Sequence, residues 1–301
     1  MLAAKKKNGS LHRMNWFDYL NCFLMLLVIL LTIYPLYYCA IVSISSGAAV
    51  TRGEVIFLPV GFDITAYKVI FGNEQIFLAY RNTIFYTALG TAINIVMTAL
   101  CAYPLSRPRL QGRKFFNFIF MLTMFISGGM IPMYLQIKSL HMLDTLWAIV
   151  LPGAINTYNM IIMRSFFSSI PEEMHEAAEI DGASHFQVLL RVVIPLSQTI
   201  IATLVLFYAV AHWNSYLSAL LYLSDSRKMP LQMIIRKMVI DSDIASMTTA
   251  NASSSAGTDT LLTENKLKYA IVIISVMPMV FIYPFLQKYF VNGVMVGGIK
   301  G

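Results

Sequence analysis

The spacing of charged side chains constrains this chain of 301 residues more than any other feature of its sequence. A bilayer core about 30 Å thick is crossed by roughly 20 residues of helix, in which charged side chains are rare. Six stretches of 19 to 33 residues contain no Asp, Glu, Lys or Arg, and these are Tyr19–Thr51, Asn82–Ser106, Phe115–Ile137, Thr145–Met163, Val192–Ser224 and Tyr269–Gln287. The sequence therefore predicts an all-α integral membrane protein with six transmembrane helices.

The composition excludes several classes of function. Hydrophobic residues make up 57% of the chain and charged residues 12%, whereas soluble domains carry about 25% charged residues. This argues against a soluble enzyme, a nucleic-acid binder and a fibrous protein. The six stretches hold no carboxylate, and HExxH, GxSxG and phosphate-loop motifs are absent, so we expect neither an intramembrane enzyme nor an ATP site. The three cysteines lack CxxC spacing and a nearby His, so no metal site is expected.

Basic residues predict the orientation in the membrane. Lys5, Lys6, Lys7 and Arg13 precede the first stretch, and the short link after the second holds Arg107, Arg109, Arg113 and Lys114. Short loops rich in Lys and Arg are cytoplasmic, and six crossings then put both termini on the cytoplasmic side. We expect these residues to contact anionic lipid rather than nucleic acid, although the net charge is +7.

The expected organisation is one membrane domain with two tails. Residues 1–18 form a cytoplasmic tail, residues 19–290 the six-helix domain with a cytoplasmic loop at 164–198, and residues 291–301 a second cytoplasmic tail. The first apolar run exceeds the roughly 7–15 apolar residues of a signal peptide, so we expect it to be an uncleaved helix.

The loop 164–198 has the sequence of two short helices separated by glycine. Ser169-Ile170-Pro171-Glu172 fits a capping box with Pro in the first turn, and Gly182 is expected to end that helix. Ser184-His185-Phe186-Gln187 fits a second capping box. We expect the acids of this loop to face water and its alanines to form a small surface that another protein can approach closely.

This segment resembles the signature of the membrane subunits of ABC importers. The family pattern is Glu-Ala-Ala, three residues, Gly, nine residues and Ile-x-Leu-Pro, and the chain has Glu176-Ala177-Ala178, Gly182 and Val192-Val193-Ile194-Pro195 at that spacing. Other stretches resemble the smaller permease of the carbohydrate-uptake branch, and most closely permeases for complex oligosaccharides or polysaccharide fragments. They are residues 127–132, 162–167, 212–216, 287–290 and 297–301.

The resemblance implies a type I ABC importer permease fold and a non-catalytic role in a bacterial cell membrane. The chain would form half of a heterodimeric pore with a second permease subunit, served by an ATPase dimer that holds ATP and Mg, and by an extracytoplasmic sugar-binding protein. The Glu-Ala-Ala segment would be the coupling helix in a cleft of the ATPase. The residues carried over to that contact are Glu172, Glu173, Glu176, Ala177, Ala178, Asp181 and Gly182.

The carboxyl-terminal tail has two interpretations. The family parallel implies that Gly297, Gly298 and Lys300 reach toward the ATPase dimer, and the alternative is a frayed polar end. In the spans, Ser127, Gly128 and Gly129 are expected to permit close helix approach or a break.

Polar residues within the apolar stretches are candidates for a sugar pathway, because they are costly in lipid and sugars need polar groups beside aromatic rings. The alternative is hydrogen bonding between helices. The candidates are Asn94, Asn156, Asn159, His212, Trp213, Asn214 and Tyr216.

An ABC permease for a non-sugar solute is the main alternative function. A secondary transporter is a weaker one, because such carriers use ionisable residues at mid-membrane and His212 alone offers little support.

Overall fold

The structure is a computed structural model that describes residues 16–238, 240 and 266–284, and every regular element in these residues is helical. The longer helices are α1 (Trp16–Ser43), α3 (Thr65–Gly72), α4 (Glu74–Ser106), α5 (Arg113–Phe125), α6 (Met130–Ser139), α8 (Thr157–Phe167), α9 (Glu172–Ile180) and α12 (Gln198–Trp213). The shorter ones are α2 (Gly47–Thr51), α7 (Trp147–Val150), α10 (His185–Val188), η1 (Leu189–Val193), α11 (Ile194–Leu196), α13 (Leu217–Tyr222) and η2 (Ser226–Lys228). Residues 231–238 are helical, and Lys266–Pro284 forms a further helix, which we call the last helix.

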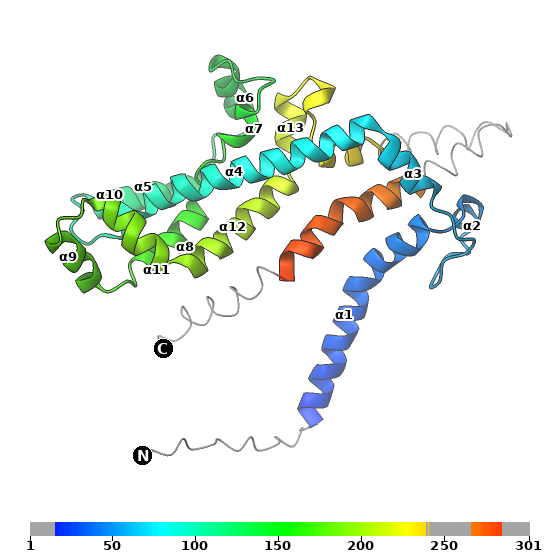
Figure 1. The fold of residues 1–301 in the computed structure, drawn as a ribbon, viewed down its shortest axis with the longest axis horizontal. Coiled ribbons are helices and arrows are strands. Elements are labelled where there is room, and N and C mark those ends of the chain that lie inside the picture. The colour runs from blue at the N-terminus through cyan, green and yellow to red at the C-terminus, as the bar shows by residue number, and fades with distance from the viewer. Residues whose placement is uncertain (1–15, 239, 241–265, 285–301) are drawn as a thin grey trace.

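Helix α4 is the axis of the fold (Figure 1). Helices α8 and α12 pack along it, and the short elements α9, α10 and α11 lie at one end of this bundle. Helices α2 and α3 lie at the opposite end, while α6, α7 and α13 project to one side. The main core lies near the α9 end, where Tyr103 of α4, Met163 of α8 and Tyr208 of α12 are buried together. Helix α4 therefore connects two ends of the molecule that carry different loops.

Three helices are long and apolar enough to cross a membrane, namely α1, α4 and the last helix. They correspond to the first, second and sixth apolar stretches. Two bent pairs raise the number of candidate spans to five among the described residues. The described residues therefore give three to five candidate spans, and the expected six are not confirmed. The length of an apolar stretch does not predict where its helix bends.

The third stretch is bent by 113° between α5 and α6. Gly129, with a φ of 82°, lies at the break, a backbone conformation that residues with a side chain rarely adopt. Apart from the adjoining residues, no atom of the described residues lies within 4 Å of the position where a Cβ would stand on Gly128 or Gly129. The small residues of this stretch therefore form a break rather than a close helix contact.

The fourth and fifth stretches are not single straight helices either. Helices α7 and α8 are separated by residues 151–156, where Pro152 and Gly153 interrupt the helix and Asn156 starts the next one. The fifth stretch bends by 85° at Ser197, between the segment that ends with α11 and helix α12. Helix α12 then ends at Trp213, eleven residues before the predicted end at Ser224.

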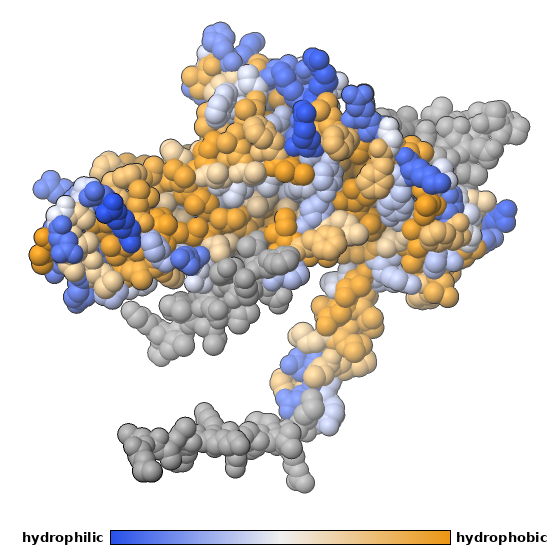
Figure 2. Space-filling view, in the orientation of Figure 1, coloured by the Kyte–Doolittle hydropathy of each residue, from blue (hydrophilic) through white to orange (hydrophobic). Residues whose placement is uncertain are grey.

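The surface of the bundle agrees with a membrane protein. In Figure 2, apolar side chains cover the middle of the visible face, while polar residues gather around α9 and α10 and on the projecting α6 and α13. Helix α5 has no buried residue, and its Phe115, Phe118 and Phe125 are exposed. A large exposed apolar surface of this kind is stable in lipid or against another membrane subunit.

A buried ion pair joins the loop after α2 to the start of the last helix. Lys266 Nζ donates to Asp63 Oδ2 at 2.7 Å and also to the Asp63 carbonyl, and only 3% of the Lys266 side chain is exposed. Asp63 Oδ1 accepts hydrogen bonds from the backbone N–H and the hydroxyl of Thr65. Hydrogen bonds from Lys266 and then Thr65 hold the pKa of Asp63 well below its usual range.

We expect Asp63→Asn to lower the free energy of unfolding by about 2–3 kcal/mol, because the buried Lys266 ammonium loses its counter-charge while Asp63 itself is partly solvated. Because the folded pKa of Asp63 is lowered, the stability it contributes is complete above the ordinary carboxyl pKa of about 4 and lost as the pH falls below it. Thermal unfolding in detergent between neutral pH and pH 3 measures both effects. An equal acid sensitivity in Asp63→Asn would contradict the assignment.

Candidate functional site

Helix α9 is the segment predicted to couple to an ATPase, and it lies at the end of the bundle beside α10 (Figure 1). Gly182 follows it with a φ of 79°, which confirms the predicted helix end. The second predicted capping box is also confirmed, because Ser184 accepts from the Gln187 backbone and the Gln187 side chain accepts from the Ser184 backbone.

The first predicted capping box is wrong. The residue that caps the start of α9 is Pro171, which is extended and offers no side-chain acceptor. The Ser169 hydroxyl instead donates to the Phe166 carbonyl at 2.7 Å, at the end of α8. The serine therefore belongs to the end of the preceding helix, and Glu172 and Glu173 supply the favourable negative charge in the first turn of α9.

The acids of α9 do not all face water, contrary to the sequence-based expectation. Glu172 Oε1 accepts from Arg107 Nη2 at 2.7 Å, and Glu176 Oε1 accepts from Arg109 Nη2 at 2.8 Å. Glu179 Oε2 accepts from Arg109 Nη1 at 3.4 Å. We call these five residues the arginine clamp. It ties α9 to the link that follows α4.

The clamp is partly shielded from water on the side of Arg107, whose side chain is 13% exposed, while Arg109 is 63% exposed. Exposed ion pairs contribute about 0–1 kcal/mol each, so Arg107 and Glu172 form the stronger pair.

His175 of α9 is buried, and its ring is tilted against the ring of Tyr103 in α4. Burial, and then the charge of Arg107, lower the pKa of His175, so its neutral form is favoured within this joint.

The remaining side of α9 is exposed. It carries Glu173, Met174, Ala177 and Ile180, and we call it the outer face of α9. Ile180 is 85% exposed and Met174 44%. Asp181 and Gly182 continue this exposed surface, whereas Ala178 is half-buried against the main core. The predicted coupling residues therefore divide between an inward clamp and an outward surface.

Four of the polar residues predicted within the spans lie at a seam between α4, α12 and the break before α8, namely Asn94, Asn156, Asn159 and His212. His212 Nε2 lies 2.6 Å from Asn94 Oδ1, and the Asn94 amide donates to the Gly153 carbonyl. The Asn156 side chain accepts from the Asn159 backbone N–H and starts α8, and Asn159 is buried. These contacts give each residue a structural partner, as the interhelical alternative expects. Their part in a sugar pathway stays a prediction.

Sequence reasoning missed two members of this seam. Thr98 Oγ1 and the Tyr208 hydroxyl lie 2.7 Å apart, and the Tyr208 oxygen also accepts from the Asn156 backbone N–H at 3.4 Å. A threonine and a tyrosine are common in apolar helices, so neither stands out in the sequence. Thr98 and Tyr208 lie on different helices, 110 residues apart in the sequence, so no local pattern predicts their contact.

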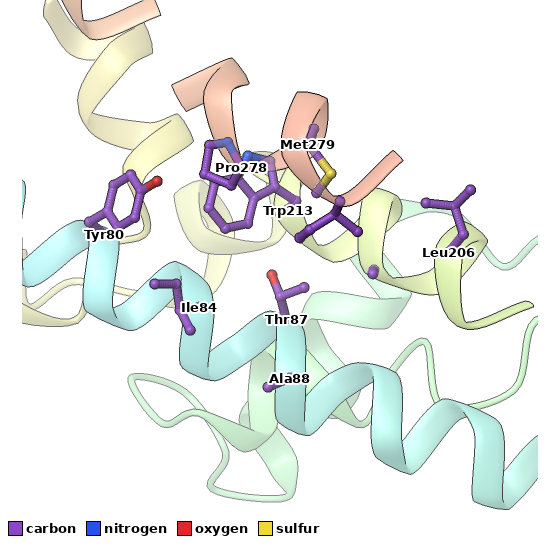
Figure 3. Close-up of a pocket in the computed structure, with 10 residues that line it drawn as sticks. Tyr80, Ile84, Thr87, Ala88, Leu206, Trp213, Pro278 and Met279 are labelled. Carbon is purple, nitrogen blue, oxygen red and sulfur yellow. The ribbon is translucent and has the colours of Figure 1, made fainter. Parts of the chain in front are cut away.

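Trp213 lines a cavity of about 420 Å³ between α4, α12 and the last helix (Figure 3). Its indole N–H donates to the Ser275 carbonyl at 3.0 Å, and Tyr80 meets its ring edge-on. Ile84 and Pro278 make the other walls apolar, while the Thr87 hydroxyl has no hydrogen-bond partner among the described residues. The cavity therefore offers a sugar an aromatic surface but few polar contacts.

The other predicted site residues lie apart from the seam. The Asn214 side chain donates back to the Val210 carbonyl and is exposed. The Arg236 guanidinium lies over the Tyr216 ring at 4.5 Å from its centroid. Gly297, Gly298 and Lys300 lie outside the described residues, as do residues 1–15 and 291–301 of the two predicted tails.

Gly90 of α4 lies close against His212 of α12. A Cβ added there would lie 2.5 Å from His212 Nε2, inside the packed seam. We expect Gly90→Ala to lower the free energy of unfolding by about 1–3 kcal/mol, because the helices must separate or His212 must leave Asn94. Thermal unfolding in detergent measures the loss.

Gly72→Ala is the matched control, because no atom lies within 4 Å of a Cβ at that position. We expect its effect to stay within about 0.5 kcal/mol. Equal stabilities for the Gly90 and Gly72 variants would show that the seam is not tightly packed.

The long apolar helices, the bent helices around a polar seam and the capped helix pair at one end define a polytopic helical membrane protein. The family model described as the binding-protein-dependent transport system inner membrane component matches residues 9–296. The chain belongs to this family, whose members are transport components rather than enzymes, as the sequence predicts.

Individual relatives cover nearly the whole chain. The polygalacturonan/rhamnogalacturonan transport system permease protein YtcP of Bacillus subtilis is 38% identical over 285 residues, which are 95% of this chain and 98% of that protein. Protein LplC of the same organism is 39% identical over 285 residues, 95% of each chain. A chain in the crystal structure of a bacterial ABC transporter involved in the import of the acidic polysaccharide alginate is 37% identical. The two superpose with a TM-score of 0.82 over 91% of this chain and 96% of that one. The resemblance to ABC importer permeases and the permease fold are therefore confirmed.

Proposed function

We propose that this chain is one permease subunit of an ATP-driven importer, and that the solute is an acidic oligosaccharide cut from a polysaccharide. The observation that carries the proposal is the likeness over almost the full chain to an alginate importer and to a polygalacturonan/rhamnogalacturonan permease. Arg236, near Tyr216, has no carboxylate partner among the described residues and would suit an anionic sugar. The solute would be delivered by an extracytoplasmic binding protein.

We propose that a partner ATPase docks on the outer face of α9, together with Asp181 and Gly182. This surface is exposed, contains the alanine of the family signature and ends at a sharp glycine turn. The arginine clamp would pass a displacement of α9 to α4, since a helix held by ion pairs and buried side chains moves as a unit. ATP and Mg would be held by the ATPase, and a second permease subunit would complete the pore.

The contacts also support the proposed membrane topology of six spans. The clamp joins the link after α4 to α9, so these two loops lie on the same side of the membrane. Asp63 joins Lys266, so the loop before α3 and the start of the last helix share the opposite side. If α1 and the last helix each cross once, both termini lie on the side of α9. The basic residues make this side the cytoplasm.

Gentle affinity purification of the full chain from its native membrane tests the proposal. We expect stoichiometric recovery of a second permease, an ATPase with a phosphate loop and a secreted binding protein that binds oligosaccharides containing uronic acids. A binding protein that prefers neutral sugars would overturn the acidic class. One that binds a non-sugar solute would favour the alternative permease function.

A further inference from the structure

The four basic residues that follow α4 fall into two pairs with different surroundings. Arg107 and Arg109 turn toward the carboxylates of α9 in the arginine clamp. Arg113 and Lys114 begin α5 and have no ion-pair partner among the described residues. The two pairs therefore have different roles, although the sequence alone predicts lipid contact for all four residues.

Arg113 and Lys114 line a cavity of about 590 Å³ at the start of α5. Its other lining residues are Pro108, Leu110, Gly112 and Asn117. Arg113 uses Nε to donate to the Leu105 carbonyl at 3.0 Å, which leaves its two terminal nitrogens available. Gly112 precedes α5 with a φ of 76° and provides no side-chain cap. The Arg113 backbone N–H donates to the Leu110 carbonyl, and the start of α5 carries a partial positive charge that favours an anion nearby.

A third cation stands behind this cavity. Arg164 at the end of α8 donates through Nη1 to Asn117 Oδ1 at 2.6 Å, and its Nε is buried without a hydrogen-bond partner in the described part of the chain. This bond uses the oxygen of the Asn117 amide, and the Asn117 nitrogen has no hydrogen-bond acceptor among the described residues. Arg113 is close enough to act on Arg164 electrostatically, so two like charges lie near each other, and neither has an ion-pair partner in the described part of the chain.

An anion in the cavity would offset this repulsion and accept from these donors. A phosphate group fits the donor set, because guanidinium, ammonium and helix amides are its usual partners. Beyond Lys114, α5 presents exposed apolar side chains at Phe115, Phe116 and Phe118. An apolar surface next to an anion site is what a phospholipid with its acyl chains would contact.

We propose that the cavity formed by Arg113, Lys114 and Asn117 binds a phosphate group, supplied by the headgroup of an anionic phospholipid at the cytoplasmic end of α5. This site holds α5 at the membrane interface and is independent of the transported solute. Free phosphate shares the same chemistry, and the exposed phenylalanines favour the lipid.

Native mass spectrometry of the importer containing the full chain tests the proposal. The detergent-solubilised complex is mixed with phosphatidylglycerol or phosphatidylcholine, and bound lipids are counted. We expect phosphatidylglycerol to be retained preferentially, and about 30-fold more weakly in the double variant Arg113→Gln/Lys114→Gln, since each basic residue contributes about five-fold. Lys114→Gln alone should show about five-fold weaker retention without affecting folding, because its side chain is exposed and has no ion-pair partner in the described residues.

Lys138→Gln is the control, since Lys138 is an exposed lysine in the last turn of α6, outside the cavity. It should leave retention unchanged. Competition by inorganic phosphate at millimolar concentration distinguishes the sources, because free phosphate as the natural ligand would displace the lipid and a lipid site would resist it. Equal retention of both lipids, or equal retention by Lys114→Gln and the unmodified chain, would overturn the proposal.

Discussion

Arg107→Glu is expected to lower substrate-stimulated ATP hydrolysis of the assembled importer about ten-fold, a loss within the usual range of coupling energies between sites. The substitution places a carboxylate beside Glu172 and within reach of Glu179, so the arginine clamp is replaced by repulsion at the base of α9. Helix α9 would then move without carrying α4. We expect basal hydrolysis to change little, because we propose that the nucleotide binds to the ATPase rather than to this chain.

The exchange variant Arg107→Glu/Glu172→Arg separates coupling from simple damage. It restores opposite charges at the same two positions, and we expect partial recovery, because Glu179 still repels the new carboxylate. Glu54→Arg is a control at the other end of the bundle, where the carboxylate has only an exposed partner at 3.6 Å. Unchanged stimulation in Arg107→Glu, with the complex intact, would show that the clamp does not transmit the movement.

Ala177→Glu on the outer face of α9 is expected to weaken binding of the ATPase by about 30-fold or more, the effect of losing a central interface contact. Ala177 is exposed and makes no contact with the main core, so the larger side chain leaves the fold intact. Ala178 is a poor test, because it is half-buried and a larger residue there would disturb packing. Recovery of the ATPase in a pull-down of the full complex measures the change.

Ala48→Glu is the matched control for this variant, since Ala48 is an exposed alanine of α2 at the opposite end of the molecule. It should leave ATPase recovery unchanged. Normal recovery with Ala177→Glu would place the ATPase contact elsewhere on the chain.

The sequence predicts the local structure of α9 well and its surroundings poorly. The helix end at Gly182 and the Ser184 capping box can be predicted from a few neighbouring residues, because helix ends depend on local backbone chemistry. The clamp joins residues 65 to 70 positions apart, and nothing in the sequence of either segment specifies that pairing. Five acids on one loop therefore suggest a solvated surface in the sequence. The structure shows that Arg107 and Arg109 bind three of them.

The helical class of the chain follows from charge spacing, but the shape of the spans does not. An uncharged stretch satisfies the same length condition whether its helix is straight, as in α4, or bent, as between α5 and α6. The Gly129 break depends on a backbone conformation that the amino-acid type permits without requiring. The polar seam is similar, because Asn94 and His212 are recognisable as costly residues while their mutual contact depends on the packing of α4 on α12.

Uptake into proteoliposomes tests whether this chain works as one subunit of an ATP-driven importer. The chain is reconstituted with its co-purified permease, ATPase and binding protein, with ATP on the ATPase side and a labelled uronic-acid oligosaccharide on the other. We predict uptake that requires ATP and the binding protein and that is lost with Arg107→Glu. Uptake by this chain alone without ATP would contradict it and identify a secondary transporter.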